Sequence, residues 1–166
     1  MALRKIREQR DEILRKKSRE VNIDDITAEK NQSLIDDMLE TMYEANGVGL
    51  AAPQVGVLRR MVVIDIGDGN GPYYMINPRI TEKDGEQVGQ EGCLSVPNKV
   101  GVVRRPNHVI AEAYDLDMNL YTIEGEGLLA RAICHELDHL DGIVYTTLVE
   151  GDLIELDDEN EEDEVE

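Results

Sequence analysis

The sequence predicts an α+β fold in which antiparallel sheets surround a central helix, with an early helix packed against them. Three observations predict it: a helical apolar stripe in the first third of the chain, strand-like segments through the middle, and a return to helical spacing near the C-terminus. With 166 residues, the chain can form one domain with its own core. Phenylalanine and tryptophan are absent, so this core rests on aliphatic side chains, methionine and a few tyrosines.

The first helix is predicted from four apolar residues whose spacing forms a stripe that can pack on a sheet. Asp24, Asp25 or Thr27 is expected to cap its start, and Asn46–Gly47 is expected to end it. The next segment, GVGLAAPQVG at 47–56, is small and loop-like. The stripe consists of Leu34, Met38, Leu39 and Met42.

The middle of the chain is expected to form strands that are separated by turns. A buried strand at 61–66 is followed by a glycine-rich turn at 67–72 and by a second strand at 73–80, which Asn77–Pro78 ends directly or shortly after. Further strand segments are expected near 86–96, 100–104 and 108–115, with Pro97–Asn98 and Pro106–Asn107 between them.

Helical spacing returns from Gly127, and Gly142 is a suitable residue to follow the end of this second helix. The helix carries His135-Glu136-Leu137-Asp138-His139, an HExxH pattern that holds two of the three histidines. Histidines four residues apart project from one helical face, so both imidazoles can reach one metal ion. Glu136 lies about 100° around the helix from His135, beside such a metal without being a ligand. The pattern predicts metal-assisted hydrolysis of an amide-like bond.

The third metal ligand is open from the residues alone, since a catalytic site usually takes three protein ligands. A zincin-type metallopeptidase would use a downstream glutamate, for which Glu150 and Glu155 are candidates. The rival is Cys93, whose thiolate would make a softer site.

Three other side chains call for an interpretation. Gln54 follows the small residues at 47–53 and offers an amide N–H to a developing oxyanion. Asp138 needs a partner inside a buried helix, and Arg105 is a candidate. His108 has no partner pattern and is interpreted as structural.

Charge and targeting signals define the expected setting of the protein. Of the 36 acidic residues, ten lie at 151–166, which has no Lys or Arg, so we expect one domain at 1–150 and an acidic, disordered tail at 151–166. The rest of the chain, residues 1–150, also has more acidic than basic residues, which argues against direct DNA binding. No apolar run could span a membrane or serve as a signal peptide, which favours a cytoplasmic location. In that compartment, metal ligation or burial of Cys93 and Cys134 is favoured over a disulfide.

Three motifs in this order resemble the signature motifs of the peptide deformylases, in their short bacterial-type form. They are GVGLAAPQ at 47–54, EGCLS at 91–95 and HELDH at 135–139, and the resemblance extends from about Ile6 to Tyr145. It implies that residues 1–150 are a single catalytic domain, and that the protein is a hydrolase of protein biosynthesis that removes the N-formyl group from the initiator formyl-methionine of nascent peptides and releases formate.

The resemblance also implies roles for individual residues. Cys93, His135 and His139 would hold the metal, and Glu136 would act as general base and then general acid. Gln54 and the backbone N–H of Leu94 would bind the oxyanion. The remaining assignments concern the substrate: the backbone at Val48, Gly49 and Leu50 would pair with the peptide, and Val48, Leu128, Ala132 and His135 would line the methionine pocket.

For the cofactor, the resemblance favours Fe²⁺, while the Cys-His-His set is also compatible with Zn²⁺, Ni²⁺ or Co²⁺. Formyl-methionyl nascent peptides are the implied partners. Some members of the family dock on the ribosome through a basic C-terminal helix, but RNA would repel the acidic end of this chain. Any transient ribosome contact is therefore expected elsewhere on the surface.

Overall fold

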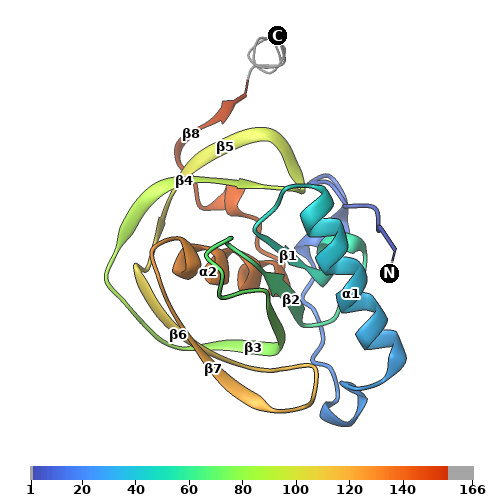
Figure 1. The fold of residues 1–166 in the computed structure, drawn as a ribbon. Helices are drawn as coiled ribbons and strands as arrows, with labels where there is room; N and C mark the ends of the chain where they lie inside the picture. The colour runs from blue at the N-terminus through green and yellow to red at the C-terminus, as the bar shows by residue number, and fades with distance from the viewer. Residues whose placement is uncertain (1, 157–166) are drawn as a thin grey trace.

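The computed structural model describes residues 2–156, which form two antiparallel sheets and two α-helices (Figure 1). One sheet has the strand order β1-β2-β3-β6-β7, and the other has the order β4-β5-β8. Helix α2 lies at the centre and α1 lies outside, beside β1 and β2, which confirms the predicted α+β class. The bounds are β1 (Gly49–Ala51), β2 (Met61–Ile64), β3 (Tyr73–Asp84), β4 (Gln87–Cys93), β5 (Val96–Arg105), β6 (His108–Tyr114), β7 (Leu120–Glu126), β8 (Glu150–Glu155), α1 (Glu29–Glu44) and α2 (Leu128–Leu140).

Strand β2 is buried on both faces because a helix packs on each of them. Its residues alternate: Met61 and Val63 belong to the apolar cluster under α1, whereas Val62 and Ile64 belong to the cluster under α2. Side chains point to opposite faces at successive strand positions, so one continuous apolar run serves two layers. This arrangement places α2, with its HExxH pattern, against the inner face of the five-stranded sheet.

Helix α1 confirms the predicted apolar stripe, but its start differs from the prediction. The residue before the helix is Ala28, which makes no side-chain cap. Asp24 and Asp25 instead lie in a preceding 3-10 turn (Ile23–Asp25) that Asn22 caps. The end of the helix is as predicted, because Asn46 has a φ of 60° and the N–H of Gly47 donates to the carbonyl of Met42.

The segment predicted as a loop at 47–56 contains a short strand and a 3-10 turn. Strand β1 pairs with β2 from Gly49 opposite Ile64 to Ala51 opposite Val62, and a 3-10 turn over Ala52–Val55 follows. Among the described residues, β1 is an outer strand of its sheet. Its other edge is therefore not paired with a strand of the described chain.

Two proline-containing segments predicted as breaks lie inside strands. Strand β3 passes through Pro78 by means of a register shift between Ile76 and Arg79, where Asn77 has a φ of 51°. Such a bulge tolerates proline because no ladder hydrogen bond is needed there. In β5, Pro97 and Asn98 are strand residues, and the turn of the β4-β5 hairpin lies at residues 94–95 instead. The sequence analysis also missed β7.

The acidic segment at 151–166 begins inside a strand. Strand β8 pairs with β5, with Glu155 opposite Lys99 and Ile154 opposite Val100, so the first residues of this segment are ordered by backbone pairing. The predicted disordered tail also includes residues 157–166, which lie outside the described residues. In the described part of the chain, no helix has the length and apolar character needed to cross a membrane.

Candidate metal and catalytic site

The HExxH segment lies in a helix whose two ends are set by glycines with positive φ. Gly127 precedes α2 with a φ of 59°, and Gly142 follows it with a φ of 78°, as the sequence predicted. An added Cβ at Gly142 would lie 2.5 Å from the carbonyl oxygen of Arg15, so only glycine fits this turn. Between these ends, His135, Glu136 and His139 are all buried.

Three side chains that can ligate a metal converge on this helix. The ligand atoms of Cys93, His135 and His139 lie within 4.8 Å of one another, and Cys93 Sγ is 3.3 Å from His139 Nε2. Zn–S and Zn–N bonds in a tetrahedral site imply a sulfur–nitrogen separation of about 3.5 Å. The donor set therefore fits one divalent metal ion. No other such group of three was found among residues 2–156.

The zincin-type alternative fails because its third ligand is elsewhere. Glu150 is bound to Arg104, at 2.8 Å from Nε. Glu155 lies on β8 with 81% of its side chain exposed, and its nearest basic partner is Lys99. Neither carboxylate belongs to the histidine cluster, whereas the β4-β5 hairpin brings Cys93 into it.

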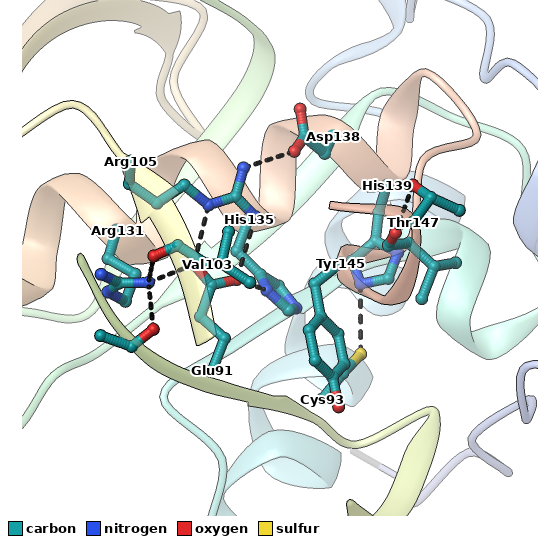
Figure 2. Close-up of polar contacts among 12 residues, drawn as sticks. Glu91, Cys93, Val103, Arg105, Arg131, His135, Asp138, His139, Tyr145 and Thr147 are labelled. Carbon is teal, nitrogen blue, oxygen red and sulfur yellow. Dashed lines mark hydrogen bonds and ion pairs between the residues drawn. The ribbon is translucent and has the colours of Figure 1, made fainter. Parts of the chain in front are cut away.

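Glu91 orients the first histidine of the pair, a role that the sequence analysis missed (Figure 2). Its Oε1 lies 2.8 Å from Nδ1 of His135, which leaves Nε2 for a metal, as carboxylate–histidine pairs do in zinc sites. The Glu91 carboxylate also accepts hydrogen bonds from Arg105 and from Arg131, at 2.7 Å each. Burial alone would raise the pKa of Glu91, but hydrogen bonds with Arg105 and His135 lower it to about 2.

Arg105 links this carboxylate to the helix. Its Nη1 donates to Oδ2 of Asp138 at 2.7 Å, which confirms the pair predicted from the sequence. Figure 2 shows Arg105 between the two acids, Glu91 and Asp138. The signal that could have identified Glu91 was the charged residue at the start of EGCLS, two positions before Cys93 and therefore on the same face of the strand.

Glu136 faces the same cavity and is almost fully buried, with 4% of its surface exposed. Its Oε1 has no hydrogen-bond partner among the described residues. Burial raises the pKa of Glu136 to about 7, in the range in which a carboxyl group can both accept and donate a proton.

Gly49 creates the room for this carboxylate. An added Cβ at Gly49 would lie 2.5 Å from Oε2 of Glu136, and 2.8 Å from its carboxyl carbon. Strand β1 thus presents its bare backbone to Glu136. This is the physical reason for a glycine at this position.

Replacement of Gly49 by alanine is expected to displace Glu136. The rate of the metal-assisted hydrolysis expected of this site should fall roughly a hundredfold, since a shift of about 1 Å in a reacting group has that effect. A matched control is Gly92→Ala in the opposite wall, where the nearest atom would be 3.4 Å from the new Cβ, an ordinary contact. Steady-state kinetics and thermal unfolding of both variants test this. Equal activities for the two variants would contradict it.

Gln54 is held in a fixed orientation beside Cys93. Its Oε1 accepts from the N–H of Ala51 at 3.0 Å, and its Nε2 donates to Ser95 Oγ at 3.0 Å and to Cys93 Sγ at 3.4 Å. The sequence analysis selected Gln54 but not Ser95, which is fully buried. The amide N–H of Gln54 therefore points toward the same place as the ligand cluster.

The cavity has a volume of about 440 Å³ and brings together residues from both sheets and α2. Leu50 is the one predicted substrate residue whose side chain is absent from the cavity lining. It lies in the core under α1, because side chains alternate along β1. Only its backbone is available to a peptide. The predicted residues in the lining are Val48, Gly49, Gln54, Cys93, Leu94, Leu128, Ala132, His135 and Glu136.

Two further residues of the sequence analysis lie away from the cavity. His108 sits at the start of β6 between Asp84 and Glu124. Cys134 is a free thiol in the core, and burial raises its pKa to about 11, so it packs as a neutral side chain.

Tyr145, which the sequence analysis did not select as a site residue, stacks on His135 with ring centroids 5.9 Å apart.

Comparisons with known proteins give a consistent result. The sequence model of the polypeptide deformylase family matches residues 3–152. The chain is 65% identical to a peptide deformylase of Agathobacter rectalis, covering 92% of this chain and 94% of the relative, and 57% identical to one of Lachnoclostridium phytofermentans, covering 99% of each. The crystal structure of a peptide deformylase from Legionella pneumophila superposes with a TM-score of 0.85 at 44% identity, covering 90% of this chain and 87% of the other.

Proposed function

The chain belongs to the peptide deformylase family, and from this premise we propose how its residues divide the work of the reaction. It is a metal-dependent hydrolase that removes the N-formyl group from nascent peptides. The observation that carries the assignment of roles is that Cys93, His135 and His139 form one cluster, and that Glu136 faces the same cavity as that cluster.

Cys93, His135 and His139 are the proposed metal ligands, and Fe²⁺ is the proposed metal. A thiolate with two imidazoles is a borderline-soft donor set, which is also compatible with Zn²⁺, Ni²⁺ or Co²⁺. When bound, the metal would supply Lewis-acid polarisation of the formyl carbonyl and activation of a water molecule. Glu91 orients His135 through Nδ1, so the ligand face of this ring is fixed before any metal arrives.

Glu136 is the proposed general base and acid. It would accept the proton of the attacking water and then deliver it to the amine that leaves as the methionine N-terminus. Its buried carboxylate has an unpartnered oxygen in the structure and is held against the backbone of Gly49. Gln54 and the backbone N–H of Leu94 are the proposed donors to the oxyanion, and Ser95 orients Gln54.

The formyl-methionyl peptide is proposed to bind along the unpaired edge of β1. The backbone at Val48, Gly49 and Leu50 would add the peptide as a strand, since β1 is an outer strand among the described residues. Val48, Leu128 and Ala132, with the ring of His135, would line the methionine pocket. The formyl group is the smallest acyl group, so a crowded cavity at the metal ligands would exclude larger ones.

Loss of the Gln54 amide should weaken the transition state more than the substrate complex. We expect Gln54→Ala to lower kcat roughly 10²- to 10³-fold, as removal of one oxyanion donor does elsewhere. Ser95→Ala should have a smaller effect, because it removes only the orientation of Gln54. Comparison of kcat and KM for both variants measures this, and a change confined to KM would argue against the role.

The domain bounds, the cellular location and the contact with the ribosome are also part of the proposal. Residues 1–150 would be the catalytic domain, and a reaction on nascent peptides supports a cytoplasmic location. A transient contact with the ribosome would use a surface other than the acidic C-terminal end, where ten acidic residues lie at 151–166.

Formate release from formyl-Met-Ala-Ser, by protein purified without oxygen and loaded with Fe²⁺ or Zn²⁺, tests the proposed function. We expect turnover with both metals, faster with Fe²⁺, and loss of metal and of turnover in Cys93→Ser. An N-acetyl peptide serves as the control substrate and should be hydrolysed far more slowly. Full metal occupancy and unchanged turnover in Cys93→Ser would contradict the proposed ligand set.

A further inference from the structure

The N-terminal segment makes backbone hydrogen bonds with two of the motifs that form the catalytic site. The N–H of Arg7 donates to the carbonyl of Gln54 at 2.6 Å, and the N–H of Gln9 donates to the carbonyl of Ser95 at 2.8 Å. Gln54 and Ser95 are 41 residues apart in sequence, and a hydrogen bond also joins their side chains. The two residues are therefore linked twice, once directly by side chains and once through the backbone of residues 7–9.

The two linked residues come from different sheets. Gln54 lies in the 3-10 turn over Ala52–Val55, which follows β1 of the five-stranded sheet. Ser95 lies in the turn between β4 and β5 of the three-stranded sheet. Within residues 2–156, no strand pairing joins the two sheets. The separation of Gln54 and Ser95 therefore depends on how the sheets pack and on the links between these two residues.

The link through the N-terminal segment limits this separation. Two steps along a chain span at most about 7 Å, so one short stretch keeps the two acceptor carbonyls close together. The bond to the Gln54 carbonyl holds the backbone from which its side chain extends, and the bond to the Ser95 carbonyl holds the turn that also carries the N–H of Leu94. The Gln54 amide and the Leu94 N–H are the two proposed donors to the oxyanion.

The N-terminal segment is anchored on both sides of these hydrogen bonds. On one side, the N–H of Ala2 and Nε of Arg4 donate to the two carboxylate oxygens of Asp37 in α1, at 2.7 and 2.9 Å (Figure 1). On the other side, Leu14 is fully buried in an apolar cluster with residues of β5. Every side chain between Arg4 and Leu14 is at least partly exposed. We call residues 2–14 the N-terminal strap.

We propose that the N-terminal strap is a positioning element of the reaction, which holds the Gln54 amide and the Leu94 N–H at the spacing that the oxyanion needs. This inference rests on the proposed function and adds Arg7 and Gln9, through their backbone, to the residues on which the rate depends. Donors that are held in place stabilise a transition state because they need not reorganise during the reaction. No residue of the strap lines the cavity, so loosening it should lower kcat more than it raises KM.

The test removes one backbone donor at a position where proline fits. The N–H of Asp11 donates to the carbonyl of Glu8 at 2.8 Å, so Gln9 is the second residue of a β-turn, a position that proline favours. Gln9→Pro therefore removes the N–H that binds Ser95 and keeps the turn. Gln9→Ala is the matched control, because it loses the same side chain and keeps the donor.

We expect Gln9→Pro to lower kcat for formyl-Met-Ala-Ser about tenfold, less than removal of a whole oxyanion donor, because the donors are displaced and not lost. KM and bound metal should change little, and Gln9→Ala should lower kcat less than Gln9→Pro. Arg7→Pro breaks the other hydrogen bond and is the second variant, with Arg7→Ala as its control. Equal kcat values for each proline variant and its alanine control would overturn the proposal.

A second background separates positioning from a general loss of structure. In Gln54→Ala the side-chain amide is absent, but the carbonyl of residue 54 and the strap are unchanged. Gln9→Pro should lower kcat by only about twofold in this background, because the effects of residues that act as a unit are not additive. Its shift in thermal unfolding should be the same in both backgrounds. An equal loss of kcat in both backgrounds would overturn the proposal, because the strap would then act on the fold alone.

Two single variants distinguish a failure of the proposed function from a failure of the strap. An unchanged kcat in Gln54→Ala would contradict the oxyanion role in the proposed function. The expected loss in Gln54→Ala, together with a Gln9→Pro variant that matches Gln9→Ala, would contradict the role of the strap alone.

Discussion

Replacement of Glu136 by glutamine is expected to lower kcat for formyl-Met-Ala-Ser by roughly 10²- to 10⁴-fold, the usual contribution of a general base. The amide has nearly the same volume as the carboxylate but cannot accept and return a proton. Glu136 lies between the two histidines in sequence, and its Oε2 lies against Gly49 rather than in the cluster of ligand atoms. The bound metal should therefore remain.

Measurement of kcat and metal content on the same preparation tests this prediction. The control is Asp138→Asn, which lies on the same helix and is bound to Arg105 instead of facing the cavity. That variant should keep more activity than Glu136→Gln and lose metal more readily, because it weakens the support of His135 through Arg105 and Glu91. Activity of Glu136→Gln within tenfold of the wild type, at full metal occupancy, would exclude Glu136 as the base.

Glu91→Gln is expected to destabilise the fold by roughly 3 kcal/mol or more, the usual effect of removing one partner from a buried ion pair. Glu91, Arg105 and Arg131 are all buried, with side-chain exposures of 3%, 5% and 9%. Removal of the negative charge leaves two guanidinium groups in the interior with Asp138 alone to balance them. His135 also loses the carboxylate that orients its ring.

Urea unfolding of the metal-free protein measures the first effect, and metal titration measures the second. An exposed pair provides the matched control: Glu112 binds Arg79, whose side chain is 72% exposed, so Glu112→Gln should cost less than about 1 kcal/mol. A loss of stability in Glu91→Gln no larger than that in the control would show that the buried network contributes little. Metal affinity should fall about 10- to 100-fold in Glu91→Gln.

The choice of Cys93 over a downstream glutamate illustrates how far the residues alone could lead. Both candidates were compatible with HExxH, and the three-motif resemblance favoured the cysteine. The structure gives the reason: the β4-β5 hairpin turns at residues 94–95 and carries Cys93 to His139, 46 residues away in sequence. Glu150 instead pairs with Arg104 on the neighbouring strand.

The differences in the fold have local causes that sequence patterns do not reveal. Pro78 and Pro97 signalled breaks, but a bulge accommodates the first and the second lies within β5. Strand β8 was not predicted because its composition is acidic, and its pairing with β5 depends on a partner strand far away in sequence. Strand propensity is weak compared with the availability of a partner edge.

The sequence by itself determined the features that depend on short spacing: the helix from 128 to 140, its end at Gly142, and the common face of His135 and His139. Four residues are about one helical turn, so this face is fixed by backbone geometry alone. The tertiary structure decided what surrounds that face. It placed Glu91 behind His135, Gly49 against Glu136 and Leu156 in the cavity wall. Each of these contacts joins segments that are distant in the chain, and such contacts form only when two sheets and a helix pack around one core.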